Sequence, residues 1–245
     1  MKALILNSGI GQRMGDFTKS APKCMTPIGA GYTIISRQLT QLTHAGIREV
    51  VITTGPFAAL LKDHIESLAL PMNIIYVQNP IYQDTNYIYS MHLAAAMLKD
   101  DILLLHGDLV LESSVLHDLI NSPASTVAVD SALPLPEKDF KARLKNGRIT
   151  AIGIEFFGAD CVACQPAYFF KQVDFLAWLK SIGVFCESGQ RRVYAENAFN
   201  AISGDIPLYP KELSGRLCNE IDNVQDLQTI SKRFMNTLIK EEAGR

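Results

Sequence analysis

Residues 1–27 read MKALILNSGIGQRMGDFTKSAPKCMTP, and the fold prediction starts from them. Residues 2–6 form an apolar run without helical periodicity, which is typical of a buried strand in a parallel sheet. The run ends at Asn7-Ser8-Gly9, and a second glycine follows at Gly11. Glycines after a buried strand let backbone N–H groups approach an anion, because no Cβ stands in the way. The pattern therefore predicts an anion site at the carboxyl end of this strand.

Two cations follow the glycine loop. Arg13 carries a planar fork of donors that suits phosphate oxygens, and Lys23 can return a second positive charge to the same place. We expect Gly9, Gly11, Arg13 and Lys23 to cradle a polyphosphate; the alternative is a glycine turn that binds nothing. A Rossmann fingerprint does not fit, because the third glycine, Gly15, comes one residue late. A P-loop does not fit either, because no Gly-Lys-Ser/Thr follows.

The composition is that of a globular protein. Hydrophobic residues make up 48% of the 245 residues and charged residues 20%, so we expect a buried core and no extended disorder. The net charge of −2 argues against a nucleic-acid binder. No apolar run approaches the roughly 18 residues of a membrane span. Five cysteines and the lack of a signal-peptide pattern favour reduced thiols and a cytoplasmic protein. Cys161 and Cys164 are interpreted as buried thiols, since zinc needs about four ligands.

Alternating strand and helix patterns predict the fold class. Strands are expected at residues 2–6, 49–53, 73–77, 101–105 and 125–129, and helices at 34–45, 57–68 and about 86–98. This rhythm is typical of an α/β, Rossmann-like, mostly parallel sheet with helices on both faces. Ligands in such sheets bind at the carboxyl ends of the strands, where the glycine loop lies. We treat residues 1–245 as a single domain.

Residues 131–157 depart from this rhythm. Runs at 140–144 and 148–154 flank Asn146-Gly147, which is a strong β-hairpin signal. We interpret 131–157 as a hairpin or lid module laid across the carboxyl end of the sheet. Beyond it we expect a helix at 172–185, a short helix at 194–200, a strand at 206–209 and a terminal helix from 224 to about 239.

Carboxylates near two strand ends are the best-placed acids. Asp108 follows the strand at 101–105 through a glycine, and Glu220 and Asp222 precede the terminal helix. In an extended stretch, residues i and i+2 point the same way. Carboxylate oxygens suit Mg²⁺, so we predict a magnesium site from Asp108, Asp222 and Glu220. The alternative for each aspartate is a turn or a helix cap. His106 is interpreted as a packed histidine rather than a base.

Residues 84–90, DTNYIYS, open the helix that follows the third strand. Thr85 or Asn86 can cap this helix, and a helix N-terminus also attracts anions. Tyr82, Tyr87 and Tyr89 cluster around it. They are either core residues or, for Tyr87 in particular, the wall of a ligand pocket.

The N-terminal stretch resembles the signature of the sugar-nucleotidyltransferase-like superfamily, through Leu6-Asn7-Ser8-Gly9-Ile10-Gly11-Gln12-Arg13-Met14 and then Pro22-Lys23. That signature usually reads L-A-A-G-x-G-x-R-[LM] and later P-K. Asn7 and Ser8 depart from the two alanines, which lie near the nucleotide base in the family, so the departure bears on the choice of base. The resemblance implies nucleotide contacts at Leu6, Asn7, Ser8, Gly9, Gly11, Arg13, Lys23 and Asn86, with Arg13, Lys23 and Asp108 in catalysis.

Further stretches resemble a narrower family. Residues 85–90 and 219–226 look like the choline-phosphate cytidylyltransferases of bacterial surface decoration. Residues 133–140, 153–157 and 194–200 look closer to the cytidylyltransferases that activate 2-aminoethylphosphonate or a related phosphonate as its CMP ester. The resemblance implies CTP as donor, Mg²⁺ at Asp108 and Asp222, and an acceptor between the hairpin and the 194–200 helix.

Simple chemistry suggests the contacts of such an acceptor. An ammonium end needs a carboxylate or an aromatic cage, for which Glu155, Glu196 and Tyr87 are available, with Asn197 on the same helix face as Glu196. A phosphonate end needs a cation, and Lys138 is the nearest candidate outside the glycine loop and its cations Arg13 and Lys23. Phosphocholine, a sugar 1-phosphate or a nucleotide-binding regulator without catalysis are the alternatives. A homodimer, or a pathway enzyme fused or adjacent to this domain, stays open.

Overall fold

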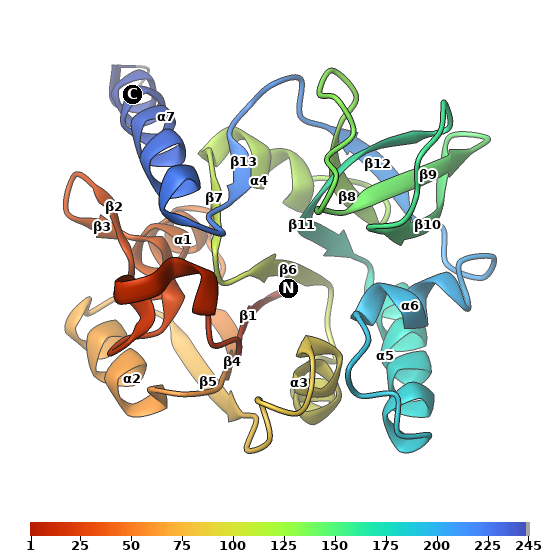
Figure 1. Ribbon diagram of the computed structural model, residues 1–245, viewed down its shortest axis with the longest axis horizontal. Coiled ribbons are helices and arrows are strands. Elements are labelled where there is room, and N and C mark those ends of the chain that lie inside the picture. Colours follow the sequence, from red (N-terminus) through yellow and green to blue (C-terminus); the bar gives the residue numbers. More distant parts are fainter. Residues whose placement is uncertain (244–245) are drawn as a thin grey trace.

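A large mixed sheet is the central feature of the computed structural model (Figure 1), which describes residues 1–243, with Gln12 described by its backbone alone. The strands of this sheet are β1 (Lys2–Asn7), β4 (Glu49–Thr54), β5 (Asn73–Gln78), β6 (Ile102–His106), β8 (Thr126–Asp130), β9 (Lys141–Lys145), β10 (Arg148–Gly153), β11 (Cys161–Phe170) and β12 (Tyr209–Glu212). Their order is β10-β9-β11-β6-β1-β4-β5, and β8 pairs with both β11 and β12. Two small ladders join β7 (Leu109–Leu111) to β13 (Cys218–Glu220) and β2 (Pro27–Gly29) to β3 (Tyr32–Thr33).

The strands β6, β1, β4 and β5 are parallel, as the sequence predicts. From β1 the chain crosses to β4 and β5 on one side and then returns to β6 on the other side of β1. A crevice opens at the carboxyl end of a parallel sheet where the strand order reverses in this way. The topology therefore places the binding site between the ends of β1 and β6.

Helices cover both faces of the sheet, which confirms the predicted fold class. They are α1 (Ile34–His44), α2 (Ala58–Ser67), α3 (Tyr87–Ala94), α4 (Ser113–Ile120), α5 (Gln172–Glu187), α6 (Ala195–Asn200) and α7 (Val224–Ala243). In β1, Ala3 and Ile5 share a core with α1, α2 and α4, whereas Leu4 and Leu6 share one with α3, α5 and α6. Successive strand residues point to opposite faces, so a continuously apolar β1 needs a helix layer on each side.

The hairpin forms where Asn146-Gly147 predicts it. β9 and β10 pair antiparallel across this turn, whose two residues have φ angles of 52° and 73°. β9 also pairs with the N-terminal part of β11, whereas the C-terminal part of β11 pairs with β6. The hairpin thus extends the sheet beyond the carboxyl end of β6; it is hydrogen-bonded into the sheet instead of lying across it.

Two strands of the large sheet differ from the prediction, and the strands of the two small ladders were not predicted. The strand expected at 206–209 is found at Tyr209–Glu212, where it pairs parallel with β8. Ile206 and Leu208 are buried, but they reach the core from the connection before the strand. The ten-residue strand β11 has no counterpart in the prediction. Among residues 1–243, no helix has the length and apolar character that crossing a membrane requires.

Candidate active site

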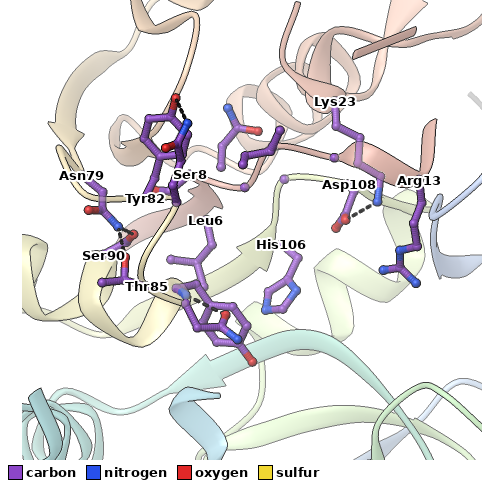
Figure 2. A pocket seen from close by; sticks show the side chains of 18 of the residues that line it. Leu6, Ser8, Arg13, Lys23, Asn79, Tyr82, Thr85, Ser90, His106 and Asp108 are labelled. Carbon is purple, nitrogen blue, oxygen red and sulfur yellow. Dashed lines mark hydrogen bonds and ion pairs between the residues drawn. The ribbon is translucent and has the colours of Figure 1, made fainter. Parts of the chain in front are cut away.

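A cavity of about 560 Å³ opens at the carboxyl ends of β1 and β6 (Figure 2). Its lining includes every residue predicted to contact the nucleotide, namely Leu6, Asn7, Ser8, Gly9, Gly11, Arg13, Lys23 and Asn86. Tyr87, Asp108 and Asp222, predicted for the acceptor and the metal, line it as well. The remaining lining residues are Ile10, Asn79, Tyr82, Gln83, Thr85, Ser90, His106 and Gly107.

Gly107 brings the ends of β1 and β6 together. Its amide donates a hydrogen bond to the carbonyl oxygen of Leu6 at 2.9 Å. A Cβ at position 107 would lie 2.8 Å from that oxygen and from Oδ1 of Asn7, a distance that side chains do not tolerate. The missing side chain therefore lets Asp108 approach the glycine loop.

Gly11 turns the loop back over Lys23. Its φ of 68° lies in the left-handed region, and a Cβ there would stand 3.1 Å from Cβ of Lys23. The chain then coils through the short 3₁₀ helix η1 (Gln12–Thr18), where the hydroxyl of Thr18 donates to the carbonyl of Gly11 at 3.0 Å. The second 3₁₀ helix, η2 (Lys23–Met25), begins with the lysine itself. This path returns the cation of Lys23 beneath the loop.

Lys23 joins two carboxylates at the floor of the cavity. Its Nζ lies 2.6 Å from Oδ2 of Asp108 and 2.9 Å from Oδ1 of Asp222, and Nη2 of Arg13 lies 2.9 Å from the same Asp222 oxygen. Burial lowers the pKa of Lys23, but the two carboxylates outweigh it and raise the pKa above its usual value. Burial raises the pKa of Asp108, but Lys23 and then His106 hold it below the usual value. The lysine and Asp108 are therefore both charged at neutral pH.

The carboxylates of Asp108 and Asp222 fit a hard divalent cation, because both present oxygen atoms to one positively charged group. Asp222 is not a helix cap: Oδ1 of Asn223 accepts from the amide of Asp226 at 3.0 Å and caps α7 instead. Glu220 is oriented differently. Its Oε1 lies 3.0 Å from Nδ1 of His106, and burial and Asp108 raise its pKa to about 7. The predicted ligand Glu220 is thus turned toward His106.

Glu196 lies behind the cavity wall. It is 1% exposed and accepts hydrogen bonds from the hydroxyls of Tyr87 and Tyr168. Burial, followed by the charge of Glu196, raises the pKa of both phenols well above the usual value, so they stay protonated donors. Tyr87 meets the ring of His106 edge-on, with 4.8 Å between ring centroids. Glu196 therefore orients the tyrosine that lines the cavity.

The structure does not bring the other predicted acceptor residues to the cavity. Lys138 is exposed in the loop before β9, whereas Nζ of the buried Lys141 donates to the carbonyl of Pro136 at 2.7 Å. The exposed Glu155 folds its carboxylate against Gly153, where a Cβ would meet Oε2 at 2.5 Å. Asn197 is exposed because α6 turns Glu196 inward and the next helical residue points about 100° away. The cavity lining therefore lacks these three residues, and their contact with the acceptor stays a prediction.

Asn79 is a lining residue that the sequence interpretation missed. It follows β5, and its Nδ2 donates to the hydroxyls of Thr85 at 2.9 Å and Ser90 at 3.0 Å. The signal was a polar residue directly after a strand of the parallel sheet, where ligands bind. His106 is packed as expected, yet it lines the cavity.

The MobA-like NTP transferase domain family matches residues 3–143 of the chain. The chain belongs to this family. It is 35% identical over 135 residues to CMP-5′-(3-aminopropyl)phosphonate synthase of Streptomyces rubellomurinus, a match that covers 55% of this chain but only 21% of that longer protein. It is 25% identical to choline-phosphate cytidylyltransferase of Streptococcus pneumoniae, over 96% of this chain and 99% of the other.

Solved structures of nucleotidyltransferases share the fold. CTP:phosphocholine cytidylyltransferase from Streptococcus pneumoniae aligns with a TM-score of 0.74 at 20% identity, over 94% of this chain and 97% of that one. Inositol-1-phosphate CTP transferase of T. maritima aligns with a TM-score of 0.75 at 20% identity, over 95% of each chain. The predicted relationship to the phosphonate and choline-phosphate cytidylyltransferases is confirmed, and with it the prediction of an enzyme of the nucleotidyltransferase class.

Proposed function

We propose that this chain transfers CMP from CTP to a small phosphonate, of which 2-aminoethylphosphonate is the best candidate, and releases pyrophosphate. The observation that carries the proposal is the cavity in which the glycine loop, two cations and two carboxylates meet. The loop and the cations suit a triphosphate, and the carboxylates suit a divalent cation. The relatives named for CMP-phosphonate synthesis and for choline-phosphate cytidylyl transfer support CTP as the donor.

The reaction needs positioning and charge neutralisation rather than a strong base. A phosphoryl oxygen of the acceptor attacks the α-phosphorus of CTP and forms a new P–O bond. The bond from the α-phosphorus to the bridging oxygen breaks, and pyrophosphate leaves with its electron pair. An acceptor of this kind loses its second proton near pH 6, so it is already nucleophilic at neutral pH. Arg13 and Lys23 supply positive charge beside the departing oxygens.

Mg²⁺ is part of the proposal because the donor set fits it. Asp108 and Asp222 would hold the ion, which would neutralise charge on the triphosphate. Glu220 would remain with His106, to which it is already hydrogen-bonded at 3.0 Å.

The acceptor is proposed to lie between the 131–157 module and α6. Hydrogen bonds fix the position of α6 relative to this module. The side chain of Asn200 in α6 makes two hydrogen bonds of 2.8 Å with the backbone of Ile152 in β10. The buried carboxylate of Glu196 stands directly behind Tyr87 and makes this wall attractive to a primary ammonium.

Phosphocholine is the second candidate. The rings of Tyr87 and Tyr194 lie 5.9 Å apart, and those of Tyr194 and Phe140 lie 5.1 Å apart. Such a cluster suits a quaternary ammonium, which cannot donate a hydrogen bond to a carboxylate.

Pyrophosphate release tests the proposal. CTP, UTP, ATP and GTP are each paired with 2-aminoethylphosphonate, phosphocholine and glucose 1-phosphate in the presence of Mg²⁺. We expect release with CTP and the aminophosphonate. Release only with phosphocholine would transfer the assignment to the second candidate, and no release with any pair would refute nucleotidyl transfer to these acceptors.

A further inference from the structure

His106 lies at the end of β6, and the proposed reaction leaves it without a role. Its side chain lines the cavity although the residue is only 8% exposed. Nδ1 is paired with Oε1 of Glu220, whereas Nε2 is buried and has no hydrogen-bond partner within residues 1–243. Buried polar atoms are nearly always paired, so an unpaired one on a residue of the cavity lining indicates a partner that the described chain does not supply, such as a ligand.

Two neighbours fix the orientation of the imidazole ring. Glu220 belongs to β13, where it pairs with Leu109 of β7, so its carboxylate is anchored by a short ladder. Tyr87 packs edge-on against the ring at 65°, and its hydroxyl is held in turn by Glu196. Because Nδ1 is engaged with Glu220, the opposite nitrogen must point away from that carboxylate.

The position of Asp108 indicates which ligand His106 meets. Ligand atoms of His106, Asp108 and Glu220 all lie within 4.8 Å of one another. Figure 2 shows the Asp108 carboxylate between the cations of Lys23 and Arg13 on one side and the His106 ring on the other. The cation side matches the triphosphate, which leaves the His106 side, next to Tyr87, for the acceptor.

We propose that His106 is a substrate contact: its Nε2 pairs with a phosphoryl oxygen of the acceptor and holds that group beside Asp108 for attack. The inference rests on the proposed function and adds to the acceptor site a residue that binds the phosphoryl group of the acceptor. Either protonation state can make the contact, because Nε2 carries the proton in both. The imidazolium donates from Nε2 to a P–O⁻ oxygen, and the neutral ring does the same when Nδ1 accepts a hydrogen bond from the protonated Glu220 carboxyl group.

Two amide variants separate a substrate contact from a packing role. In His106→Gln the side-chain amide reaches the position of Nε2, whereas in His106→Asn it reaches the position of Nδ1 and can pair only with Glu220. A substrate contact predicts that His106→Asn raises the KM for 2-aminoethylphosphonate about 10- to 100-fold, the usual effect of losing a hydrogen bond to a charged group. His106→Gln should stay much closer to the wild type, and the KM for CTP should change little in both.

His117→Gln is the matched control, because His117 lies on α4 with its side chain 74% exposed. A packing role predicts the reverse order, with His106→Asn the milder variant. That order, or an unchanged acceptor KM in His106→Asn, would overturn the assignment. Absence of turnover in the wild-type enzyme would instead refute the proposed function.

Methylphosphonate shows which end of the acceptor His106 contacts, because it keeps the phosphoryl group and lacks the amine. Its inhibition constant should rise in His106→Asn by about the same factor as the KM for 2-aminoethylphosphonate. An unchanged constant would assign His106 to the amine end and overturn the proposal.

Should both variants fail to fold, the Nε2 resonance of the ¹⁵N-labelled wild type provides the test. It should shift when methylphosphonate is added with CTP and Mg²⁺, and no shift would overturn the contact.

Discussion

Lys23 is the residue on which the charge balance of the cavity depends. Its ammonium group is the shared partner of Asp108 and Asp222. We expect Lys23→Met to lower kcat/KM about 10²- to 10³-fold, as loss of a preorganised donor does, and to lower Tm as well, because Asp108 and Asp222 lose their shared partner. Pyrophosphate release and thermal denaturation measure the two effects. Lys19→Met is the control, since the Lys19 side chain is 75% exposed and pairs with Asp16. A large drop in Tm with normal turnover would make Lys23 structural.

Asp108 has the complementary role. We expect Asp108→Asn to abolish measurable pyrophosphate release while the melting temperature stays within a few degrees of the wild type, because the amide keeps the shape but loses the charge. Lys23 would retain Asp222 as a partner. Asp118→Asn, on the surface of α4, provides the comparison variant. A near-normal rate in Asp108→Asn would remove this carboxylate from the mechanism.

The raised pKa of Glu220 leads us to expect that the stability of the fold depends on pH. Its pKa rises from 4.5 to about 7 in the folded protein through burial and Asp108. Between these values the folded chain keeps a proton that the unfolded chain has lost, so stability is greatest at the acid end and declines as pH rises. Burial lowers the pKa of His106, but Glu220 outweighs it, and the net rise adds a loss of the same sign above 6.5.

We expect the free energy of unfolding to fall by about 1–3 kcal/mol between roughly pH 5 and pH 8 from this pair. Glu220→Gln cannot titrate at this position and should lose most of that decline. Chemical denaturation at a series of pH values measures it. Parallel pH profiles for the wild type and Glu220→Gln would contradict the assignment.

The strand-end rule accounts for the part of the site that the sequence predicts. Asn7 ends β1 and Asp108 follows β6, and parallel strands end at one edge of the sheet, so their proximity follows from the pattern. The pattern did not predict which side chains on the helix and in the loop point into the protein and which point to solvent. Glu196 and Asn197 are adjacent on one helix, yet only Glu196 turns inward, and Lys141 rather than Lys138 is buried. These choices depend on packing against elements distant in sequence.

At the level of elements, β11 shows why a strand escaped prediction. It carries Pro166, which cannot donate to a ladder, and the pairing with β8 shifts register between Cys164 and Tyr168. The irregularity accommodates the proline within a long, buried strand. Pro210 in β12 has a similar effect: among residues 1–243 this strand pairs with β8 alone, so it lies at an edge of the sheet, where proline is tolerated.

The turn of the β9–β10 hairpin offers an element-level test. Gly147 has a φ of 73°, which costs a residue with a Cβ about 1–2 kcal/mol. We expect Gly147→Ala to lower the free energy of unfolding by about this amount and to leave CTP binding unchanged, because the turn is not part of the cavity lining. Gly204→Ala is the control, since a Cβ there meets no atom within 4 Å and its φ is not left-handed. Equal stability losses in the two variants would contradict the explanation.

At the scale of the whole molecule, the order of the strands creates the site. The chain leaves β1 in one direction and returns to β6 on its other side, so the glycine loop and Asp108 meet at one crevice. The antiparallel strands β11, β9 and β10 then extend the sheet past the end of β6. One continuous sheet thus carries both the predicted nucleotide residues and the proposed acceptor module.

The same arrangement predicts how metal affects global stability. In the free protein the cations of Lys23 and Arg13 already neutralise the carboxylates of Asp108 and Asp222, so the fold does not need a metal ion there. We expect millimolar Mg²⁺ alone to leave the wild-type Tm nearly unchanged, and Mg²⁺ with CTP to raise it, because a ligand that binds only the folded state stabilises it by mass action. A chelator should abolish pyrophosphate release without lowering Tm. In Lys23→Met the two carboxylates lose their shared partner, so Mg²⁺ alone should now raise Tm. Stabilisation of the wild type by Mg²⁺ alone, equal to that of the variant, would show that the ion and the lysine do not share these carboxylates.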